Sequence, residues 1–410
     1  MNATVIRNAR VDGQPGLVDI ALEDDRINGL VSASSTPGLR VIDAGGRIVL
    51  PGFVDSHMHL DKAFTLEDAP NHSGTLDEAV AIFRDRKKKF TPEDLKGRAR
   101  RLAEMASSHG TTALRTHADV EETVGLMGLA ALLEVKEEFA GRVDIQVVAF
   151  PSIGSLDKEA NRELLEEALR LGADVVGGNP TRDADHIRHI DAVFALAQKY
   201  DRPIDMHVDE SDNPKDLALE YLAEKTLREG YRGKVAAGHC CSLAAVDDGT
   251  AGRVIEKVRE ADISVITLPS CNLYLQGRRD RYPIRRGLTR VKELLAAGVN
   301  VAYASDNVKD PFNPFGKADM LQIAHLTAHA AHLGGMEEQR TVLRMGTYHA
   351  ARVLGLDRYG LSPGCRADLT MLDTRSFQDV IADQPNRVLV FKDGKSLLNR
   401  LGTIGDPTLS

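Results

Sequence analysis

Eight short apolar runs, separated by amphipathic stretches of helical length, constrain the fold of this chain more than any other feature. The runs are RIVLPGFVD, TTALRTH, VDIQVVAF, ADVVGG, RPIDMHV, KVAAGH, ISVITL and NVAYASD. Continuous apolar strands that alternate with helices indicate a parallel sheet covered on both faces. Eight such units predict a (β/α)₈ barrel, although a doubly wound open sheet would have the same periodicity.

The two ends of the chain have a different texture, in which apolar and polar residues alternate in short stretches. TVIRNARV and LVDIALEDDRINGLV show it near the start, and RADLTMLD and RVLVFKDGKSLL show it near the end. This alternation predicts a small antiparallel structure, and Asp393-Gly394 predicts a hairpin turn. Since neither end has enough strands to bury a sheet face alone, we expect residues 1–50 and 361–410 to form one small β-sandwich domain beside a barrel of residues 51–360.

Composition excludes several classes of protein. The chain has 410 residues, of which 42% are hydrophobic and 27% charged, so it can bury a sizeable core. Its net charge is −8, and its one dense basic run is Arg84 to Lys89, so no nucleic-acid partner is expected. No signal peptide, no run of about 18 apolar residues and no disulfide or CxxC spacing is present. We therefore expect a soluble, cytoplasmic protein without a membrane partner.

Residue types that bind metals close four of the eight runs. His57 and His59 follow the first run, His207 closes the fifth, His239 the sixth and Asp306 the eighth. The carboxyl ends of barrel strands meet at one mouth, so these side chains should converge. Neutral imidazoles and one carboxylate, with a position open to water, are typical of a mononuclear hydrolytic site. The sequence thus predicts one divalent metal per chain.

Other candidate ligands receive different interpretations. A second metal would need a bridging lysine at a middle strand end, and the third and fourth runs end without one. Lys62 follows the first run too late to bridge and is interpreted as a loop charge. His117 closes the second run and fits a pocket or a hydrogen-bonded core position equally well. Three histidines on a late helical stretch, His325, His329 and His332, are interpreted as a surface stripe or a subunit contact. Cys240 and Cys241, which follow the sixth run, are expected to pack in the core.

Long segments of the chain resemble the amidohydrolase superfamily, and within it the bacterial cytosine deaminases. PGFVDSHMHLDK, RTHADV, DIQVVAFP and LYLQGRRDRYPIRRGLTRVKELLAAGVNV are similar to successive segments of that branch. The terminal β segments match the small sandwich domain that its members carry. The resemblance implies that zinc or iron(II) is bound by the four ligands His57, His59, His207 and Asp306. It also implies that Glu210 is the acid/base group and that His239 lies beside the bound hydroxide.

The resemblance further implies positions that contact the substrate, and some of them depart from the family pattern. Leu76, at the end of SGTL, and Gln276, in LQGR, correspond to such positions, although a loop-bracing amide is an equally good interpretation of Gln276. Ser152, Asn307 and Phe312 stand where the cytosine-specific pattern has glutamine, aspartate and tryptophan. A site that loses a hydrogen-bond partner loses discrimination sharply, so deamination is a firmer expectation than cytosine itself.

These residues predict an aminohydrolase that releases ammonia from a cytosine-like small N-heterocycle by attack of a metal-bound hydroxide. One alternative is removal of an N-substituted amine from an aminotriazine: the related N-isopropylammelide amidohydrolase shares segments with this chain but has aspartate at the position of Glu210. A cyclic amide hydrolase normally has the bridging lysine, which this chain lacks. A metal-free binding protein on this barrel would have lost metal ligands, and here all four predicted ligands are present. The apolar late helix is compatible with a homo-oligomer.

Overall fold

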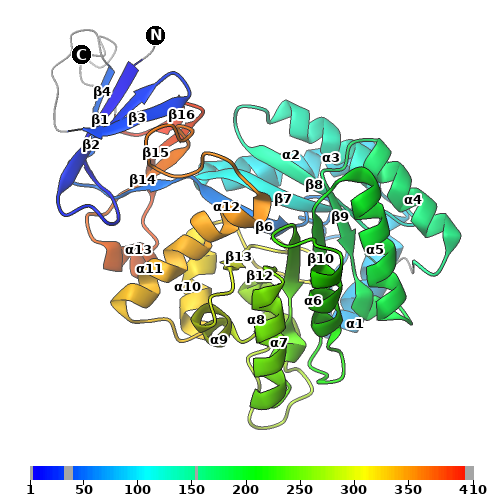
Figure 1. The fold of residues 1–410 in the computed structure, drawn as a ribbon. Coiled ribbons are helices and arrows are strands. Elements are labelled where there is room, and N and C mark those ends of the chain that lie inside the picture. The colour runs from blue at the N-terminus through cyan, green and yellow to red at the C-terminus, as the bar shows by residue number, and fades with distance from the viewer. Residues whose placement is uncertain (1–2, 32–39, 153–155, 402–410) are drawn as a thin grey trace.

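The computed structural model describes residues 3–31, 40–152 and 156–401 (Figure 1). Parts of the predicted small domain, residues 1–2, 32–39 and 402–410, lie outside the described residues.

A nearly closed sheet of parallel strands forms the centre of the molecule, with one strand from each predicted run. In the described chain these strands are β6 (Phe53–Met58), β7 (Thr111–Asp119), β8 (Asp144–Phe150), β9 (Val175–Gly178), β10 (Ile204–Val208), β11 (Val235–His239), β12 (Ser264–Thr267) and β13 (Val301–Tyr303). Neighbours in the sheet are neighbours in the sequence, and an isolated parallel bridge between Met58, at the end of β6, and Asp306, just after β13, nearly closes the barrel. The predicted (β/α)₈ barrel is confirmed.

Helices connect successive strands and lie mostly outside the barrel (Figure 1). They are α1 (Leu76–Lys87), α2 (Pro92–Ser108), α3 (Met127–Glu138), α4 (Glu159–Arg170), η1 (Pro180–Arg182), α5 (His186–Tyr200), α6 (Ala218–Arg228), η2 (Cys241–Ala244), α7 (Asp248–Glu260), α8 (Pro269–Leu275), α9 (Val291–Ala296), α10 (Met320–Ala330), α11 (Met336–Met345), α12 (Tyr348–Leu354) and α13 (Phe377–Asp383). The local signals are strong at α2, where the Thr91 side chain accepts from the Asp94 N–H and Pro92 occupies the first turn. α1 lies within the long connection between β6 and α2.

Both ends of the chain contribute to one small β domain, as predicted. One sheet has the strand order β3 (Arg26–Val31), β2 (Leu17–Glu23), β1 (Ala3–Arg10), β4 (Arg40–Asp43). The other sheet has the order β16 (Lys395–Asn399), β15 (Arg387–Lys392), β14 (Leu369–Leu372), β5 (Val49–Pro51). The two sheets share a core that includes Ile20 and Phe391, and the turn at Asp393-Gly394 joins β15 to β16. β1 and β4 pair in parallel, which corrects the expectation of a purely antiparallel structure. The boundaries at residues 50 and 361 remain predictions.

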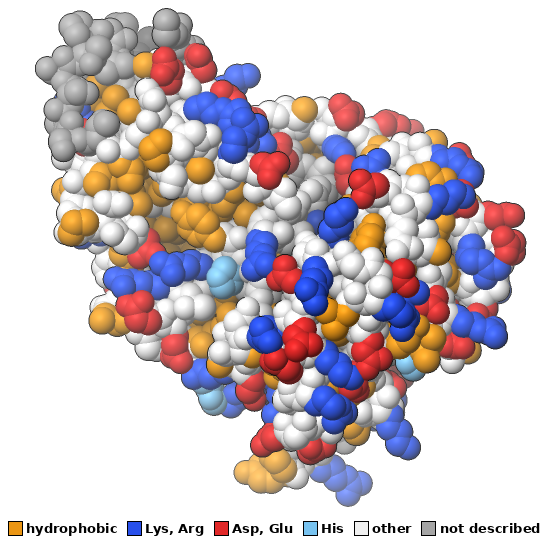
Figure 2. Space-filling model, in the orientation of Figure 1, with side chains coloured by type: hydrophobic (Ala, Val, Ile, Leu, Met, Phe, Trp, Pro, Cys, Tyr) orange, Lys and Arg blue, Asp and Glu red, His pale blue; other side chains and the backbone are white. Residues whose placement is uncertain are grey.

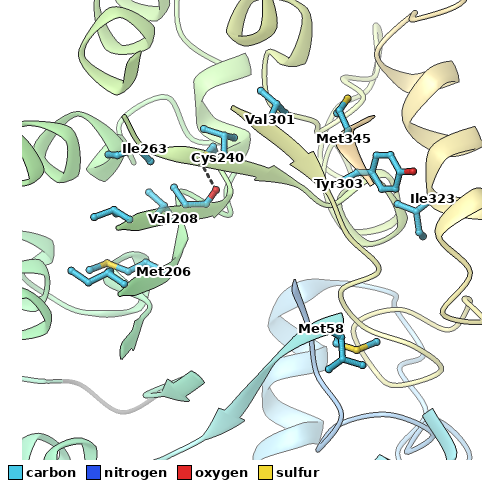
Figure 3. Packing of buried hydrophobic residues seen from close by; sticks show 14 of the residues in the cluster. Met58, Met206, Val208, Cys240, Ile263, Val301, Tyr303, Ile323 and Met345 are labelled. Carbon is cyan, nitrogen blue, oxygen red and sulfur yellow. Dashed lines mark hydrogen bonds between the residues drawn. The ribbon is translucent and has the colours of Figure 1, made fainter. Parts of the chain in front are cut away.

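Buried hydrophobic side chains fill the space between the barrel and its helices. Figure 3 shows Val208 and Cys240 side by side in this core. Cys240 is 0% exposed, Cys241 is 3% exposed, and the Cys240 N–H donates to the Val208 carbonyl at 2.8 Å. Both cysteines therefore pack, as predicted.

Surface side chains of both charge signs are interspersed over the face shown in Figure 2. On α10, Nδ1 of His325 lies 3.0 Å from the Ile381 carbonyl oxygen and Nδ1 of His329 lies 2.9 Å from the His325 carbonyl oxygen. These contacts agree with the interpretation of the late histidines as a helix-surface stripe. None of the described helices has the length and apolar character needed to cross a membrane.

Candidate metal centre and active site

The side chains predicted to bind metal converge at the carboxyl ends of the barrel strands. Nε2 of His207 lies 3.2 Å from Nε2 of His57 and 3.2 Å from Nε2 of His59. Oδ1 of Asp306 lies 3.3 Å from Nε2 of His59 and 3.8 Å from Nε2 of His57. Two ligands that share one ion at about 2.1 Å lie roughly 3.0–3.4 Å apart. Three of these four distances are in or near this range, so the four residues gather at one place, although His59 groups by mutual distance with His57 and His117 and not with His207 and Asp306.

The chemistry of these donors fits a divalent cation. The four residues are at most 4% exposed. Burial, and then the neighbouring imidazoles, lowers the pKa of His57 and of His207, so these rings are neutral bases. Both carboxylate oxygens of Asp306 are buried and have no hydrogen-bond partner in the described chain. A buried carboxylate among neutral imidazoles is costly unless a cation balances it.

Local backbone geometry produces this convergence. The Asp306 N–H donates to the His57 carbonyl at 2.9 Å, so the closure of the barrel joins the first and last strand ends at the site. A Cβ atom at Gly238 would lie 3.0 Å from Cε1 of His57, so β11 needs glycine where that ring packs. His239 (φ 68°) and Asp306 (φ 58°) have left-handed backbone conformations, which are uncommon for residues other than glycine. Such strain is typical of functional sites.

Glu210 and His239 form a pair beside the cluster. Oε1 of Glu210 lies 3.7 Å from Nδ1 of His239, and Nδ2 of Asn272 donates to the same nitrogen at 3.0 Å. Nε2 of His239 is buried without a hydrogen-bond partner in the described chain. One ring nitrogen of His239 lies within 4.8 Å of ligand atoms of His57, His207 and Asp306. His239 can thus donate a hydrogen bond close to the cluster.

His117 packs against the cluster and is not part of the cavity wall, so it is a core residue, although neither ring nitrogen has a hydrogen-bond partner in the described chain. It is 0% exposed, and its ring centroid lies 4.1 Å from that of His57. Its Nε2 lies 3.5 Å from Oδ1 of Asp205, whose other carboxylate oxygen accepts from Arg115 Nη1 at 2.8 Å. His117 also belongs to a second possible donor group with His57 and His59.

A cavity opens over the cluster, and its wall contains Glu210, His239 and Asp306. Of the residues predicted to contact the substrate, the wall includes Leu76, Ser152, Asn307 and Phe312. The structure does not bring Gln276 to this wall. Gln276 follows the end of α8 and packs on Gly287, where a Cβ atom would lie 2.2 Å from that of Gln276.

Lys62 is part of the cavity wall, so the charge predicted on this loop is buried beside the cluster and not solvated. It is 5% exposed, and its Nζ lies 3.4 Å from Oδ1 of Asp119 and 5.3 Å from the ring centroids of Phe150 and Phe312. Burial alone would lower the pKa of Lys62, but Asp119 and Asp61 raise it above the ordinary value. The ammonium group is therefore charged in its buried position.

Besides the predicted Leu76, α1 contributes wall residues that the sequence analysis did not identify. Leu76, Val80, Phe83, Arg84 and Lys87 share one face of the helix, and all five line the cavity. Nζ of Lys87 donates to Ser152 Oγ at 2.9 Å and to Glu121 Oε1 at 3.3 Å, and it also contacts Asp119. Ser152 therefore holds a lysine at the position where the family pattern has a glutamine.

Comparisons with known proteins agree with this geometry. Residues 40–154 and 71–397 match the sequence family described as the Amidohydrolase family. The chain belongs to the amidohydrolase family. It is therefore a hydrolase that acts on C–N bonds, as predicted. The resemblance to the cytosine deaminase-like branch is also confirmed by the relatives and the solved structures that are similar over almost the whole chain.

Three such proteins are informative. N-isopropylammelide isopropyl amidohydrolase of Pseudomonas sp. (strain ADP) is 33% identical over 402 residues, which cover 96% of each chain. Pterin deaminase of Rhizobium rhizogenes (strain K84) is 32% identical over 381 residues, which cover 92% of this amidohydrolase and 87% of the relative. The structure of 5-methylcytosine deaminase from Klebsiella pneumoniae with phosphonocytosine has 36% identity and a TM-score of 0.93, and covers 98% of this chain and 100% of that one.

Proposed function

We propose that this amidohydrolase is a metal-dependent aminohydrolase that releases ammonia from a small N-heterocycle of the cytosine type. The pairing of Glu210 with His239, beside the donor cluster and on the cavity wall, carries the proposal. A site that only stores a metal does not require a carboxylate and an imidazole that face the substrate. The similarity to a pterin deaminase and to a 5-methylcytosine deaminase supports the same reaction class.

In this proposal His57, His59, His207 and Asp306 hold one divalent ion, either zinc or iron(II). When bound, such an ion lowers the pKa of a water molecule to about 7, so that water attacks at neutral pH. Asp306 has a second carboxylate oxygen that is buried and free of hydrogen bonds within the described residues. That oxygen is placed to accept the proton which the attacking water loses.

Glu210 and His239 then act on the ring and on the developing charge. His239 donates from Nε2 to the attacking oxygen and stabilises it as the ring carbon becomes tetrahedral. Glu210 protonates a ring nitrogen, which makes the ring carbon electrophilic. The proton that Asp306 took from the water then passes to the leaving amine, and the hydroxyl proton of the tetrahedral carbon returns to Glu210. The carbon–nitrogen bond breaks, ammonia leaves, and the ring keeps a carbonyl oxygen in place of the amine.

An ammonia-release screen tests the proposal. Protein with a measured zinc and iron content is incubated with aminopyrimidines, aminotriazines, aminopteridines and creatinine, and ammonia is quantified. We expect release from at least one of these compounds and none after treatment with a chelator. A fully metal-loaded sample that releases ammonia from none of them contradicts the proposal.

A second candidate is the removal of an N-substituted amine from an aminotriazine. The 33% identity to N-isopropylammelide isopropyl amidohydrolase over 402 residues favours it. Chromatography of the products separates the candidates, because this reaction releases an alkylamine and the first releases ammonia. A ring-opened product would instead indicate the cyclic amide hydrolase. A cytoplasmic location and a homo-oligomeric state also remain predictions, and size-exclusion chromatography tests the second.

A further inference from the structure

The cavity has two chemically different sides. Glu210, His239 and Asp306 form a catalytic side at the ends of β10, β11 and β13. The lining also includes four cationic residues from other elements, which we call the basic wall: Lys62, Arg84, Lys87 and Arg182. The catalytic side accounts for the proposed reaction at the amine, and it leaves the basic wall without a role.

The positive charges of the two lysines of the basic wall are balanced by carboxylates inside the protein. Lys87 has three acceptors, the carboxylates of Asp119 and Glu121 and the hydroxyl of Ser152. Burial raises the pKa of Asp119, but Lys62 and Lys87 together lower it below its ordinary value, so this carboxylate is ionised. Two ammonium groups therefore face the two carboxylates of Asp119 and Glu121, and their charges balance.

The two arginines of the basic wall are not compensated in this way. Arg84 comes from α1 and Arg182 from η1, and both are exposed at the mouth of the cavity. In the part of the chain that the structure describes, neither guanidinium forms an ion pair. Other basic groups on α1 do, since Arg86 Nη2 lies 3.1 Å from Asp68 Oδ2 and Lys88 Nζ lies 2.7 Å from Asp85 Oδ1.

We infer that the substrate carries an anionic group, a carboxylate in its simplest form, that is bound by Arg84 and Arg182 while the ring lies at Glu210 and His239. A guanidinium has a planar fork of donors that matches a carboxylate, and two forks from separate elements fix its direction. Lys62 adds a buried ammonium whose single close carboxylate is Asp119, at 3.4 Å, among the described residues. Its remaining hydrogens suit a ring oxygen. This placement of the ring rests on the proposed function.

Binding of unreactive ring analogues tests the inference on the metal-loaded enzyme. Uracil-6-carboxylate is compared with 6-methyluracil, and uracil-5-carboxylate with 5-methyluracil, by isothermal titration calorimetry. None of these compounds has an amine to lose, so affinity is measured without turnover. We expect at least one carboxylate to bind about tenfold or more tightly than its methyl partner, because a charge-assisted hydrogen bond replaces an apolar contact.

Substitutions in α1 and η1 assign that preference to residues. Arg84→Ala and Arg182→Ala should each reduce the preference for the carboxylate roughly fivefold or more, with little effect on the methyl compounds. Lys88→Ala is the matched control, because it removes one positive charge from the same helix at a residue that is paired with Asp85 and lies outside the cavity. It should leave the preference unchanged.

Three results would overturn the inference. These are an absence of preference for either carboxylate, a preference that survives both arginine substitutions, and an equal loss in Lys88→Ala. The outcome is separable from that of the proposed function. Ammonia release without a carboxylate preference removes the basic wall from substrate binding and leaves the deaminase proposal intact. A carboxylate preference without any ammonia release supports the basic wall and contradicts the deaminase.

Discussion

The catalytic side and the basic wall face the same cavity but come from different parts of the fold. His207, Glu210 and His239 stand on or directly after barrel strands, where the sheet dictates their positions. Arg84, Lys87 and Arg182 stand on a helix and a short turn that connect those strands. In a (β/α)₈ barrel the strand ends are fixed by closure of the sheet, whereas the connections vary. In the proposed function, the comparison assigns the reaction to the barrel and the choice of substrate to its connections.

The two sides also differ in how their charges are satisfied. Asp306 is 1% exposed, and both its oxygens have no hydrogen-bond partner within the described chain. Asp119 is 2% exposed and contacts two ammonium groups. With Glu121, which also contacts Lys87, the second arrangement balances two ammonium groups with two carboxylates. Asp306 has no lysine or arginine within ion-pair distance among the described residues, which fits an added cation. Changes on the catalytic side should therefore alter metal content and turnover, and changes in the basic wall should alter stability or binding.

The largest effect is expected from loss of the metal ligand Asp306. Asp306→Asn removes the one anionic donor, so metal content should fall and kcat should drop by more than about 10³-fold, since a bound metal contributes several kcal/mol to the barrier. Metal analysis together with the ammonia assay measures both quantities. Asp383→Asn, a substitution at the end of α13 and outside the cavity wall, serves as the control. A variant that keeps full metal content and turnover would remove Asp306 from the site.

Glu210→Gln separates proton transfer from metal binding on the catalytic side. The amide cannot exchange a proton with the ring, so kcat should fall roughly 10²- to 10⁴-fold while metal content stays constant. Steady-state kinetics and metal analysis on the same preparation provide the measurement. Undiminished kcat in this variant would show that Glu210 is not the acid/base group.

Lys87→Met tests the internal compensation of the basic wall. Lys87 and Asp119 have side chains that are 1% and 3% exposed, and loss of the lysine leaves buried carboxylates with one cation fewer. Removing one partner of a buried pair typically costs about 3–5 kcal/mol, so the free energy of unfolding should fall by an amount of this order. Denaturant unfolding measures it. Lys88→Met, at an exposed pair on the same helix, should change stability by less than about 1 kcal/mol, and equal effects of the two variants would contradict the comparison.

The smallest effect is expected from a change of pH on the binding of the uracil carboxylates. Burial lowers the pKa of Lys62, but Asp119 and Asp61 raise it further, so the net shift is upward. A lysine with a raised pKa is charged at every pH below its ordinary value and loses that charge only as the pH rises through the raised one. Arginine is charged throughout, so the preference for each carboxylate over its methyl partner should stay constant between about pH 6 and pH 8. Calorimetry with the uracil carboxylates checks this, and a midpoint near neutrality would assign the binding to other groups.

Most of the fold and the donor cluster could be predicted from the sequence, because both follow from local patterns. Each apolar run defines a strand, and each strand end defines where His57, His207 or Asp306 will lie. Lys62 could not be placed, because its role depends on a turn in which its N–H donates to the His59 carbonyl at 3.3 Å, and on Asp119 from the next strand. Sequence spacing carries no information about that contact.

The basic wall shows a different kind of limit. The run from Arg84 to Lys89 is visible in the sequence, and helical periodicity places Arg84 and Lys87 on one face with Phe83. Nothing in the run indicates that this face lines a cavity, since the same pattern occurs on solvated helices. Gln276 is the opposite case, a residue that the resemblance indicated as a substrate contact but that does not line the cavity. The end of α8 packs on Gly287 and keeps Gln276 out of the wall.

Anomalous diffraction from crystals of the metal-loaded protein tests the shared metal site most directly. We expect a single peak about 2.0–2.2 Å from Nε2 of His57, His59 and His207 and from one carboxylate oxygen of Asp306, with His239 outside bonding distance. A peak bound by His117 or by His239 and Glu210, or no peak in protein that contains metal, would contradict this assignment.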